Sequence, residues 1–186
     1  MRIVGGKFRG REIIAPPGQD IRPTADRVRE SLFNILEHGK ANIRLEGARV
    51  LDAFAGTGAL GLEALSRGAR CVTFMDSDTK ACRINIEALD VGAETNLIRA
   101  DCLSPPKASE SCDLIFLDPP YNKGLAPPAL EVLIATGWIT ENTICVVELA
   151  AKEPFEPPSG FAIKEERRYG TARVILVTSD ELASHT

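Results

Sequence analysis

The stretch DLIFLDPPYN, residues 113–122, places a carboxylate, two prolines and an aromatic ring at the end of an apolar run. Two consecutive prolines fix two φ angles and remove two N–H donors, so the backbone after Asp118 is stiff and extended. The carbonyl groups of Asp118 and Pro119 are then left without a ladder to join. Such a turn, with Tyr121 beside it, is suited to binding a planar group that offers N–H donors.

A second stretch that could bind a ligand is VLDAFAGTGALGLEAL, residues 50–65. Gly56, Gly58 and Gly61 form a GxGxxG pattern between a predicted strand and a predicted helix, which lets backbone and a helix N-terminus approach a ligand. The pattern alone also fits a dinucleotide. The acid Asp52 before the loop favours S-adenosylmethionine over NAD, because a carboxylate repels a pyrophosphate but tolerates a sulfonium and an ammonium.

Two further carboxylates follow predicted strands. Asp76 ends CVTFMD, and a carboxylate there can accept both hydroxyl groups of a ribose. An acid that merely precedes a helix is the alternative, and Asp78 fits that role better. Asp101 follows NLIRA, where it or its neighbouring backbone could bind an adenine amino group, with an ordinary loop aspartate as the alternative.

Strands and helices that must position these groups alternate from residue 48 onward. We expect strands over residues 48–54, 69–76, 95–101, 112–118 and 142–150, and helices over 58–68, 77–92 (with Ser77 as N-cap) and 128–138. Residues 161–178 read as a hairpin around Tyr169-Gly170-Thr171. This order predicts a parallel sheet covered on both faces, closed by an antiparallel pair. Ligands bind beyond the carboxyl ends of such strands, so we expect four acids to border one cleft: Asp52, Asp76, Asp101 and Asp118.

The region before residue 48 predicts a short β-hairpin, a loop and a helix. The hairpin joins residues 1–6 to residues 10–17, and the helix begins at Thr24 as N-cap after Pro23. Its apolar stripe is Val28, Leu32, Ile35 and Leu36. Its opposite face is Arg27, Glu30 and Asn34, for which a solvated surface and a place over the cofactor cleft are equally open.

Composition is that of a soluble globular domain, with 44% apolar and 26% charged residues among 186. No apolar run is long enough for a membrane span, and the start lacks a signal peptide, so we expect a cytoplasmic protein. The five cysteines form no CxxC pair and there are two histidines, so we expect reduced core thiols and no metal.

Charge is unevenly spread along the chain. Residues 1–11 hold four basic residues and no acid, Arg2, Lys7, Arg9 and Arg11, whereas the net charge of the whole chain is −4. A basic arm on an acidic body suits a polyanionic partner. Lysine and arginine that guard a hairpin edge are the alternative.

The motifs together resemble a known family. LDAFAGTGALGLEAL with LIFLDPPY resembles the class I S-adenosylmethionine-dependent methyltransferases that modify exocyclic amino groups of nucleic-acid bases. MRIVGGKFRGREI, RPTADRVRESLFNIL and YGTARVILV are similar to the RsmD family of bacterial 16S ribosomal RNA guanine-N2 methyltransferases. The resemblance extends from residue 1 to about residue 178 and departs at Asp76, where a glutamate is expected in the family.

This resemblance implies a doubly wound, mostly parallel seven-stranded sheet of the Rossmann-like type over residues 24–186, with an antiparallel C-terminal hairpin. Residues 1–23 would form a basic β-hairpin arm and loop. Asp118 and the Pro119 carbonyl would each accept one hydrogen of the guanine amine, and Tyr121 would stack on the base. Implied cofactor-binding residues are Asp52, Gly56, Gly58, Gly61, Asp76, Asp101 and Asp118, and implied RNA-binding residues are Arg2, Lys7, Arg9, Arg11, Pro120 and Tyr121.

The implied substrate is 16S ribosomal RNA, either free or in an assembling small ribosomal subunit, and the implied enzyme is a monomer without metal. Three other functions remain open. A DNA adenine or cytosine methyltransferase would share the motifs, but it normally needs a recognition insertion for which no segment has room. A methyltransferase acting on a protein glutamine amide would not need the basic arm. A nucleotide-binding module without activity would not need an intact DPPY.

Overall fold

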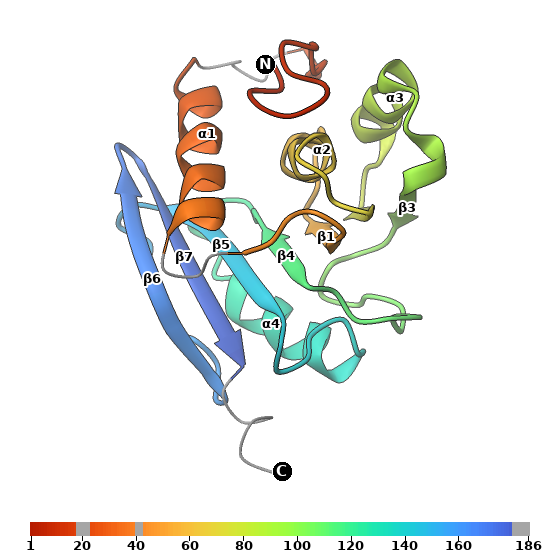
Figure 1. Cartoon of the computed structure of the whole chain (residues 1–186). Coiled ribbons are helices and arrows are strands. Elements are labelled where there is room, and N and C mark those ends of the chain that lie inside the picture. The colour runs from red at the N-terminus through yellow and green to blue at the C-terminus, as the bar shows by residue number, and fades with distance from the viewer. Residues whose placement is uncertain (18–22, 40–42, 180–186) are drawn as a thin grey trace.

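A seven-stranded sheet forms the centre of the computed structural model of this chain, which describes residues 1–17, 23–39 and 43–179 (Figure 1). The strand order is β3-β2-β1-β4-β5-β7-β6. The strands are β1 Arg49–Ala53, β2 Cys71–Asp76, β3 Thr95–Arg99, β4 Leu114–Leu117, β5 Ile144–Ala150, β6 Phe161–Tyr169 and β7 Ala172–Ser179. The helices are α1 Pro23–His38, α2 Ala59–Ser66, α3 Lys80–Leu89, the 3₁₀ turn η1 Gly92–Glu94 and α4 Ala126–Ala135.

The predicted fold class is confirmed. Strands β1 to β5 pair in parallel, and β7 pairs antiparallel with both β5 and β6. The β6–β7 connection is the predicted tight turn, with Gly170 at a φ of 58°, in the left-handed region that favours glycine. A register shift between Ile163 and Glu165 bends the outer strand β6.

Strand order reverses beside β1, and this reversal decides where a ligand can bind. The chain runs from β1 outward to β2 and β3, then returns to form β4 on the other side of β1. Open α/β sheets bind ligands beyond the carboxyl ends of the strands at such a point. We therefore expect a ligand site at the segments that follow Ala53 and Leu117.

Helices cover both faces of the sheet because successive strand residues point to opposite faces. One apolar cluster contains residues of α1, α2 and α3, and another contains residues of α4. In β4, Leu114 and Phe116 belong to the first cluster, whereas Ile115 and Leu117 belong to the second. All four are buried, which explains the uninterrupted apolar run of this strand.

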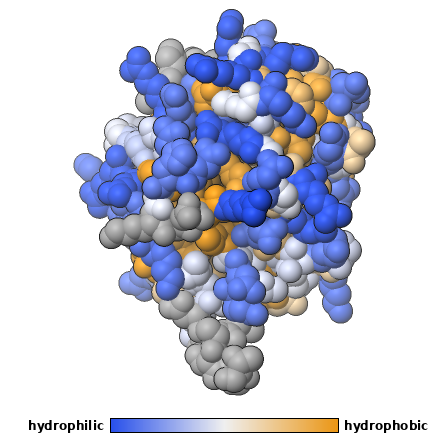
Figure 2. Space-filling view, in the orientation of Figure 1, coloured by the Kyte–Doolittle hydropathy of each residue, from blue (hydrophilic) through white to orange (hydrophobic). Residues whose placement is uncertain are grey.

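The face of the molecule drawn in Figure 2 is mostly polar. Hydrophilic side chains cover most of the face in Figure 2, with apolar side chains visible in a band between them. The large apolar side chains that are exposed in the described part are Ile14, Ile84, Tyr121 and Ile163. No helix in the described ranges is long and apolar enough to cross a membrane.

The N-terminal segment pairs less than the sequence predicts. A single antiparallel bridge joins Arg2 to Glu12, in place of two short strands. The amides of Val4 and Gly5 donate instead to the carboxylate of Glu63 in α2, at 2.9 and 2.8 Å. These amides are therefore satisfied by a side chain and cannot extend a ladder.

Helix α1 presents a wider apolar stripe than predicted. Leu32 and Leu36 are buried and Val28 and Ile35 are half-buried, as expected, but Phe33 is buried too. The predicted polar face is exposed along its length, at Arg27, Glu30 and Asn34. The helix begins at Pro23, and the side chain of the predicted cap, Thr24, lies outside the described residues.

Helix α3 begins later than predicted. Thr79, and not Ser77, occupies its N-cap position, and the helix starts at Lys80. The Ser77 hydroxyl contacts Asp76 Oδ1 at 3.4 Å, while the Asp78 carboxylate accepts the Lys80 N–H at 3.1 Å. The residues between strand and helix therefore form a short turn, held by two aspartates.

Candidate active site

Asp52, in β1, holds the backbone of the glycine loop by a hydrogen bond. It is buried, and its Oδ2 accepts the Gly61 N–H at 2.8 Å, in the first turn of α2. Burial raises the pKa of Asp52 to about 7, while the Gly61 N–H lowers it and the Asp76 carboxylate raises it. The sequence predicted that Asp52 borders the cofactor cleft, whereas in the structure Asp52 is buried and its carboxylate bonds the backbone of the glycine loop.

The three glycines of the loop have two different structural roles. Gly56 has a φ of 54°, and an added Cβ there would have no heavy atom within 4 Å, so space beside the loop is open. At Gly58 an added Cβ would come within 2.7 Å of Cys82 Sγ, and at Gly61 within 2.4 Å of Phe74. Gly58 therefore permits close approach of the loop to α3, Gly61 permits close packing of α2 on the sheet, and Gly56 lies where a ligand can approach.

Asp76 joins the end of β2 to the same loop. Its Oδ2 accepts the Gly56 N–H at 2.9 Å, and its Oδ1 accepts the Asp78 N–H at 3.0 Å. Asp76 is half-buried, so its carboxylate oxygens retain capacity for further donors. Asp101 is exposed, and its Oδ1 accepts the Leu103 N–H at 2.9 Å within its own loop.

Asp118 lies directly after β4, next to both β1 and β5. Its N–H points to the Ala53 carbonyl at 3.5 Å, and the preceding Leu117 pairs with Val147. The next position along β5 is Glu148, so continuing this register brings Asp118 beside Glu148, whose charge acts on the Asp118 carboxyl. Both stand two positions after residues whose side chains face the cluster of α1 and α2, Phe116 and Val146, and so on the same face of the sheet.

Glu148 was not predicted from the sequence. It is half-buried in β5, and its Oε1 accepts a hydrogen bond of 2.8 Å from the Tyr121 hydroxyl. This bond holds the Tyr121 ring, which remains 40% exposed. The sequence pattern that could have indicated it is an acid inside the apolar run ICVVELA.

Asp118, Glu148 and Asp52 form a cluster of neighbouring carboxyl groups, and each group's pKa reflects its surroundings. Burial raises the pKa of Asp118 well above the ordinary value, and the carboxylates of Glu148 and Asp52 raise it further. Because the Asp118 residue as a whole is exposed, the neighbouring carboxylates contribute more to this raised pKa than burial does. Burial also raises the pKa of Glu148, while the Tyr121 hydroxyl and the Arg29 charge lower it. Such a cluster favours ligands that offer cations or N–H donors.

Glu153 fixes the loop that follows the DPPY turn, and it too was missed. It is buried, and its carboxylate accepts the Asn122 N–H at 2.7 Å and the Gly124 N–H at 3.4 Å. Asn122 has a φ of 59°, a conformation that asparagine tolerates better than most residues. The turn is therefore held by backbone stiffness on one side and by a buried acid on the other.

A buried carboxylate also fixes the basic arm, residues 1–11. Glu63 is fully buried and, besides its two arm amides, it pairs with Arg29 at 3.3 Å and with Arg67 at 2.8 Å. Arg29 in turn bonds the Arg2 carbonyl and pairs with Asp26 at 3.0 Å. The predicted RNA-binding side chains of the arm remain exposed: Arg2, Lys7, Arg9 and Arg11.

Asn85 connects the segment after the arm to the glycine loop. This buried residue of α3 exchanges two hydrogen bonds with the backbone of Ile14, at 2.8 and 2.9 Å. Its Nδ2 also donates to the Thr57 carbonyl at 2.9 Å. The segment that follows the arm and the predicted cofactor loop are therefore tied to one side chain.

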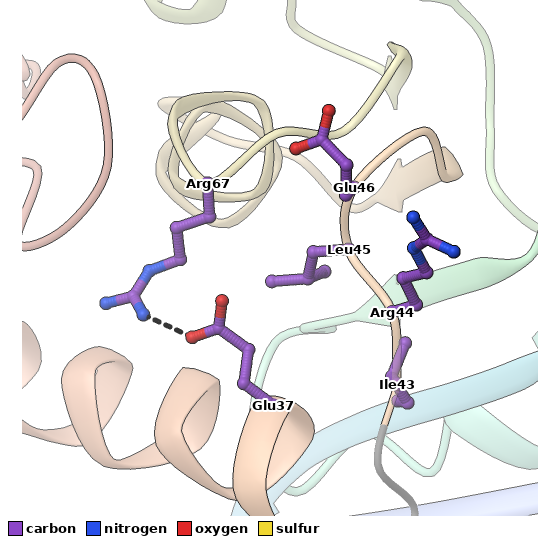
Figure 3. A pocket seen from close by; sticks show the side chains of 6 residues that line it. All are labelled: Glu37, Ile43, Arg44, Leu45, Glu46 and Arg67. Atoms are coloured by element: carbon purple, nitrogen blue, oxygen red, sulfur yellow. Dashed lines mark hydrogen bonds and ion pairs between the residues drawn. The ribbon is translucent and has the colours of Figure 1, made fainter.

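A cavity of about 390 Å³ lies elsewhere (Figure 3). Its lining residues are Glu37, Ile43, Arg44, Leu45, Glu46 and Arg67. Residues 43–46 precede β1, so the cavity lies at the amino end of that strand, away from Asp118. Arg67 already pairs with Glu37 at 2.7 Å, as the dashed line in Figure 3 shows, and with Glu63. This cavity is not part of the candidate active site.

Known proteins match nearly the whole chain. The family described as Conserved hypothetical protein 95 matches residues 1–178. Ribosomal RNA small subunit methyltransferase D of Haemophilus influenzae is 34% identical over 177 residues, covering 91% of this chain and 89% of that protein. The protein of the same name from Escherichia coli strain K12 is 33% identical, covering 91% of this chain and 85% of that one.

Solved structures agree with the sequence matches. The structure described as putative methyltransferase yhhF from Escherichia coli has a TM-score of 0.81 and 33% identity, and the match covers 97% of this chain and 98% of that one. The magnesium protoporphyrin IX methyltransferase of Synechocystis, solved with bound SAM, has a TM-score of 0.63 at 18% identity, which extends the likeness of fold to a distant methyltransferase. The chain belongs to the RsmD family, that of the proteins named ribosomal RNA small subunit methyltransferase D.

Proposed function

We propose that this protein transfers a methyl group from S-adenosylmethionine to the exocyclic N2 amine of a guanine in 16S ribosomal RNA. One observation carries the proposal beyond family membership. The DPPY turn follows β4 beside the glycine loop of β1, with the Tyr121 ring exposed and hydrogen-bonded to Glu148. An acid, a stiff carbonyl and an accessible ring are thereby placed together where this fold binds ligands.

The residues around the glycine loop fit S-adenosylmethionine. Gly56 borders open space, and the half-buried Asp76 carboxylate at the end of β2 is placed to accept the ribose hydroxyls. Asp101, after the next strand, accepts from the adenine amino group in this proposal. Asp118, which is exposed, and Asp76 make this edge acidic, which suits a sulfonium and an ammonium and disfavours a pyrophosphate, while Asp52 holds the backbone of the glycine loop. When bound, S-adenosylmethionine supplies an electrophilic methyl group, and the electrons of the broken C–S bond remain on sulfur.

The chemical task of the DPPY turn is to make a poor nucleophile react. The lone pair of the guanine N2 amine is delocalised into the ring. The Asp118 carboxylate and the Pro119 carbonyl each accept one N2 hydrogen, which directs the lone pair toward the methyl carbon. Both acceptors are held by rigid backbone before the base arrives, so little ordering remains at reaction. Once N2 has gained the methyl group it becomes strongly acidic, and Asp118 accepts the proton that it releases.

The base and its RNA are held by residues outside this pair. Tyr121 stacks on the guanine ring, with Pro120 beside it. The exposed cations of the arm contact phosphates: Arg2, Lys7, Arg9 and Arg11. No step requires a metal ion.

The substrate is tested by nucleoside mass spectrometry of 16S ribosomal RNA from strains with and without the gene. We expect loss of one N2-methylguanosine and unchanged DNA methylation. Loss of a DNA mark or of a methylated glutamine would assign the protein to another class. Calorimetry tests the methyl donor: S-adenosylmethionine and its demethylated product should bind the purified protein, and NAD should produce no heat.

A further inference from the structure

Glu148 occupies the position in β5 nearest to the proposed catalytic carboxylate. Leu117 of β4 pairs with Val147 of β5, and Asp118 and Glu148 are the next residues after this pair. Paired positions of parallel strands point to the same face, which here is the face covered by α1. A base whose amine contacts Asp118 therefore meets the Glu148 carboxylate along the same edge.

Glu148 is also oriented before any base binds. The hydrogen bond from Tyr121 engages Oε1, and each carboxylate oxygen has two acceptor positions. The charge of Arg29, in α1, also acts on Glu148. The carboxylate is thus fixed next to the ring that would stack on the base, with acceptor capacity remaining.

We propose that Glu148 selects guanine by accepting the N1–H of the base whose N2 amine contacts Asp118. The inference rests on the proposed function. Guanine carries N1–H and the N2 amine side by side on its Watson–Crick edge, so two neighbouring carboxylates can each accept from it. Adenine N1 and cytosine N3 present a lone pair next to their amine, and a carboxylate repels a lone pair. Glu148 is therefore a specificity-determining residue, and its bond to Tyr121 makes it a positioning residue too.

The test compares two RNA substrates that differ at the target nucleotide. One contains guanine and the other 2-aminopurine, which keeps the 2-amino group but has a lone pair at N1 in place of the hydrogen. Wild-type protein should prefer guanine in kcat/KM by about 10- to 100-fold, the discrimination of one good base contact. The same preference should be present in Kd, measured by fluorescence anisotropy without the methyl donor.

Glu148→Gln separates base selection from ring positioning. The carboxamide oxygen can still accept from Tyr121, whereas its NH2 group can donate to N1 of 2-aminopurine. We expect the guanine preference to fall at least about 10-fold, in both kcat/KM and Kd. Tyr121→Phe is the matched control: it removes the hydroxyl that orients Glu148 but keeps the carboxylate, so it should weaken both substrates and lower the guanine preference by less than Glu148→Gln does. Glu148→Asp keeps the charge and should keep guanine as the preferred base.

The outcomes distinguish this inference from the proposed function. If Glu148→Gln methylates guanine but retains the wild-type ratio, Glu148 only positions Tyr121 and the inference is wrong, while the proposed function stands. If wild-type protein methylates no guanine in RNA, both are wrong. Melting temperature and affinity for S-adenosylmethionine, measured on every variant, identify any loss that comes from misfolding.

Discussion

Tyr121 donates its hydroxyl hydrogen to Glu148 at 2.8 Å, and so a residue of the DPPY turn is held by the neighbouring strand β5. The residue as a whole stays 40% exposed. An aromatic side chain that is anchored at its polar end and open on its face is prepared for stacking. The structure thus separates two contributions of Tyr121, the ring and the hydroxyl.

Substitutions at Tyr121 should differ accordingly. Tyr121→Phe keeps the ring and loses one hydrogen bond, which should lower single-turnover methylation roughly 2- to 10-fold. Tyr121→Ala loses the stacking surface and should cost about 1–3 kcal/mol of base binding. Equal losses for the two variants would mean that the ring makes no contact with the base.

The arm cations predict a specific salt dependence. Replacing Arg2, Lys7, Arg9 and Arg11 singly by glutamine should weaken RNA binding and flatten the plot of log K against log salt by up to about one unit per phosphate contact. Affinity for S-adenosylmethionine should not change. Lys107→Gln is the matched control, because Lys107 is exposed next to Ala108, whose amide bonds Thr136 after α4 on the other face of the sheet. An unaltered slope for all four arm variants would mean that the arm cations do not contact phosphates and only protect the edge of the arm.

Glu63 should contribute far more to the free energy of unfolding than a surface acid does. Glu63→Ala leaves Arg29 and Arg67 without a buried partner and frees two arm amides, so unfolding free energy should fall by about 3–5 kcal/mol. Glu37→Ala removes a more exposed partner of the same Arg67 and should cost about 0–1 kcal/mol. Urea unfolding measures both, and hydrogen exchange at Val4 and Gly5 should accelerate only in the Glu63 variant. Similar costs for the two variants would contradict the central role of Glu63.

Asp52 should give the free energy of unfolding an unusual dependence on pH. Its pKa is raised in the folded protein, from 3.8 to about 7, so between these values the folded state retains a proton that the unfolded chain releases. Stability contributed by this group is present at low pH and is lost as pH rises toward 7. Relative to Asp52→Asn, which cannot ionise, wild type should therefore lose roughly 1–4 kcal/mol between pH 4 and pH 8.

Denaturant unfolding of both proteins across this range is the measurement. The asparagine oxygen can still accept the Gly61 N–H, and any fixed cost of its buried NH2 group is independent of pH. Parallel stability curves for the two proteins would show that Asp52 does not titrate in this range.

The sequence identified those parts of the site that depend on neighbours along the chain. The apolar run of β4 ending at Asp118, the glycines after β1 and the acid ending β2 are local patterns, and all lie at the carboxyl edge as predicted. The relation between Asp118 and Glu148 depends on which strands adjoin and in what register. No periodicity encodes that register, so Glu148 was read as an ordinary strand residue.

The buried polar residues were missed for the same reason. Glu63, Asn85 and Glu153 bond backbone groups that are 58, 71 and 31 residues away in the chain. In sequence, each resembles a polar residue of a solvated helix face or loop. The N-terminal hairpin was overpredicted because alternation alone cannot show that Glu63 takes the amides a second strand would need.

Single-turnover methylation of saturating RNA by Asp118→Ala tests the central claim most directly. The substitution removes one preorganised acceptor while Pro119 keeps its carbonyl, so we expect a rate loss of about 10²- to 10³-fold with little change in affinity for S-adenosylmethionine. Asp118→Asn, which keeps a carbonyl acceptor, should retain some activity, and the double change of Asp118 and Tyr121 to alanine should cost less than the sum of the single losses. If Asp118→Ala methylates at the wild-type rate, Asp118 only terminates β4, and the assignment of catalysis to the DPPY turn is wrong.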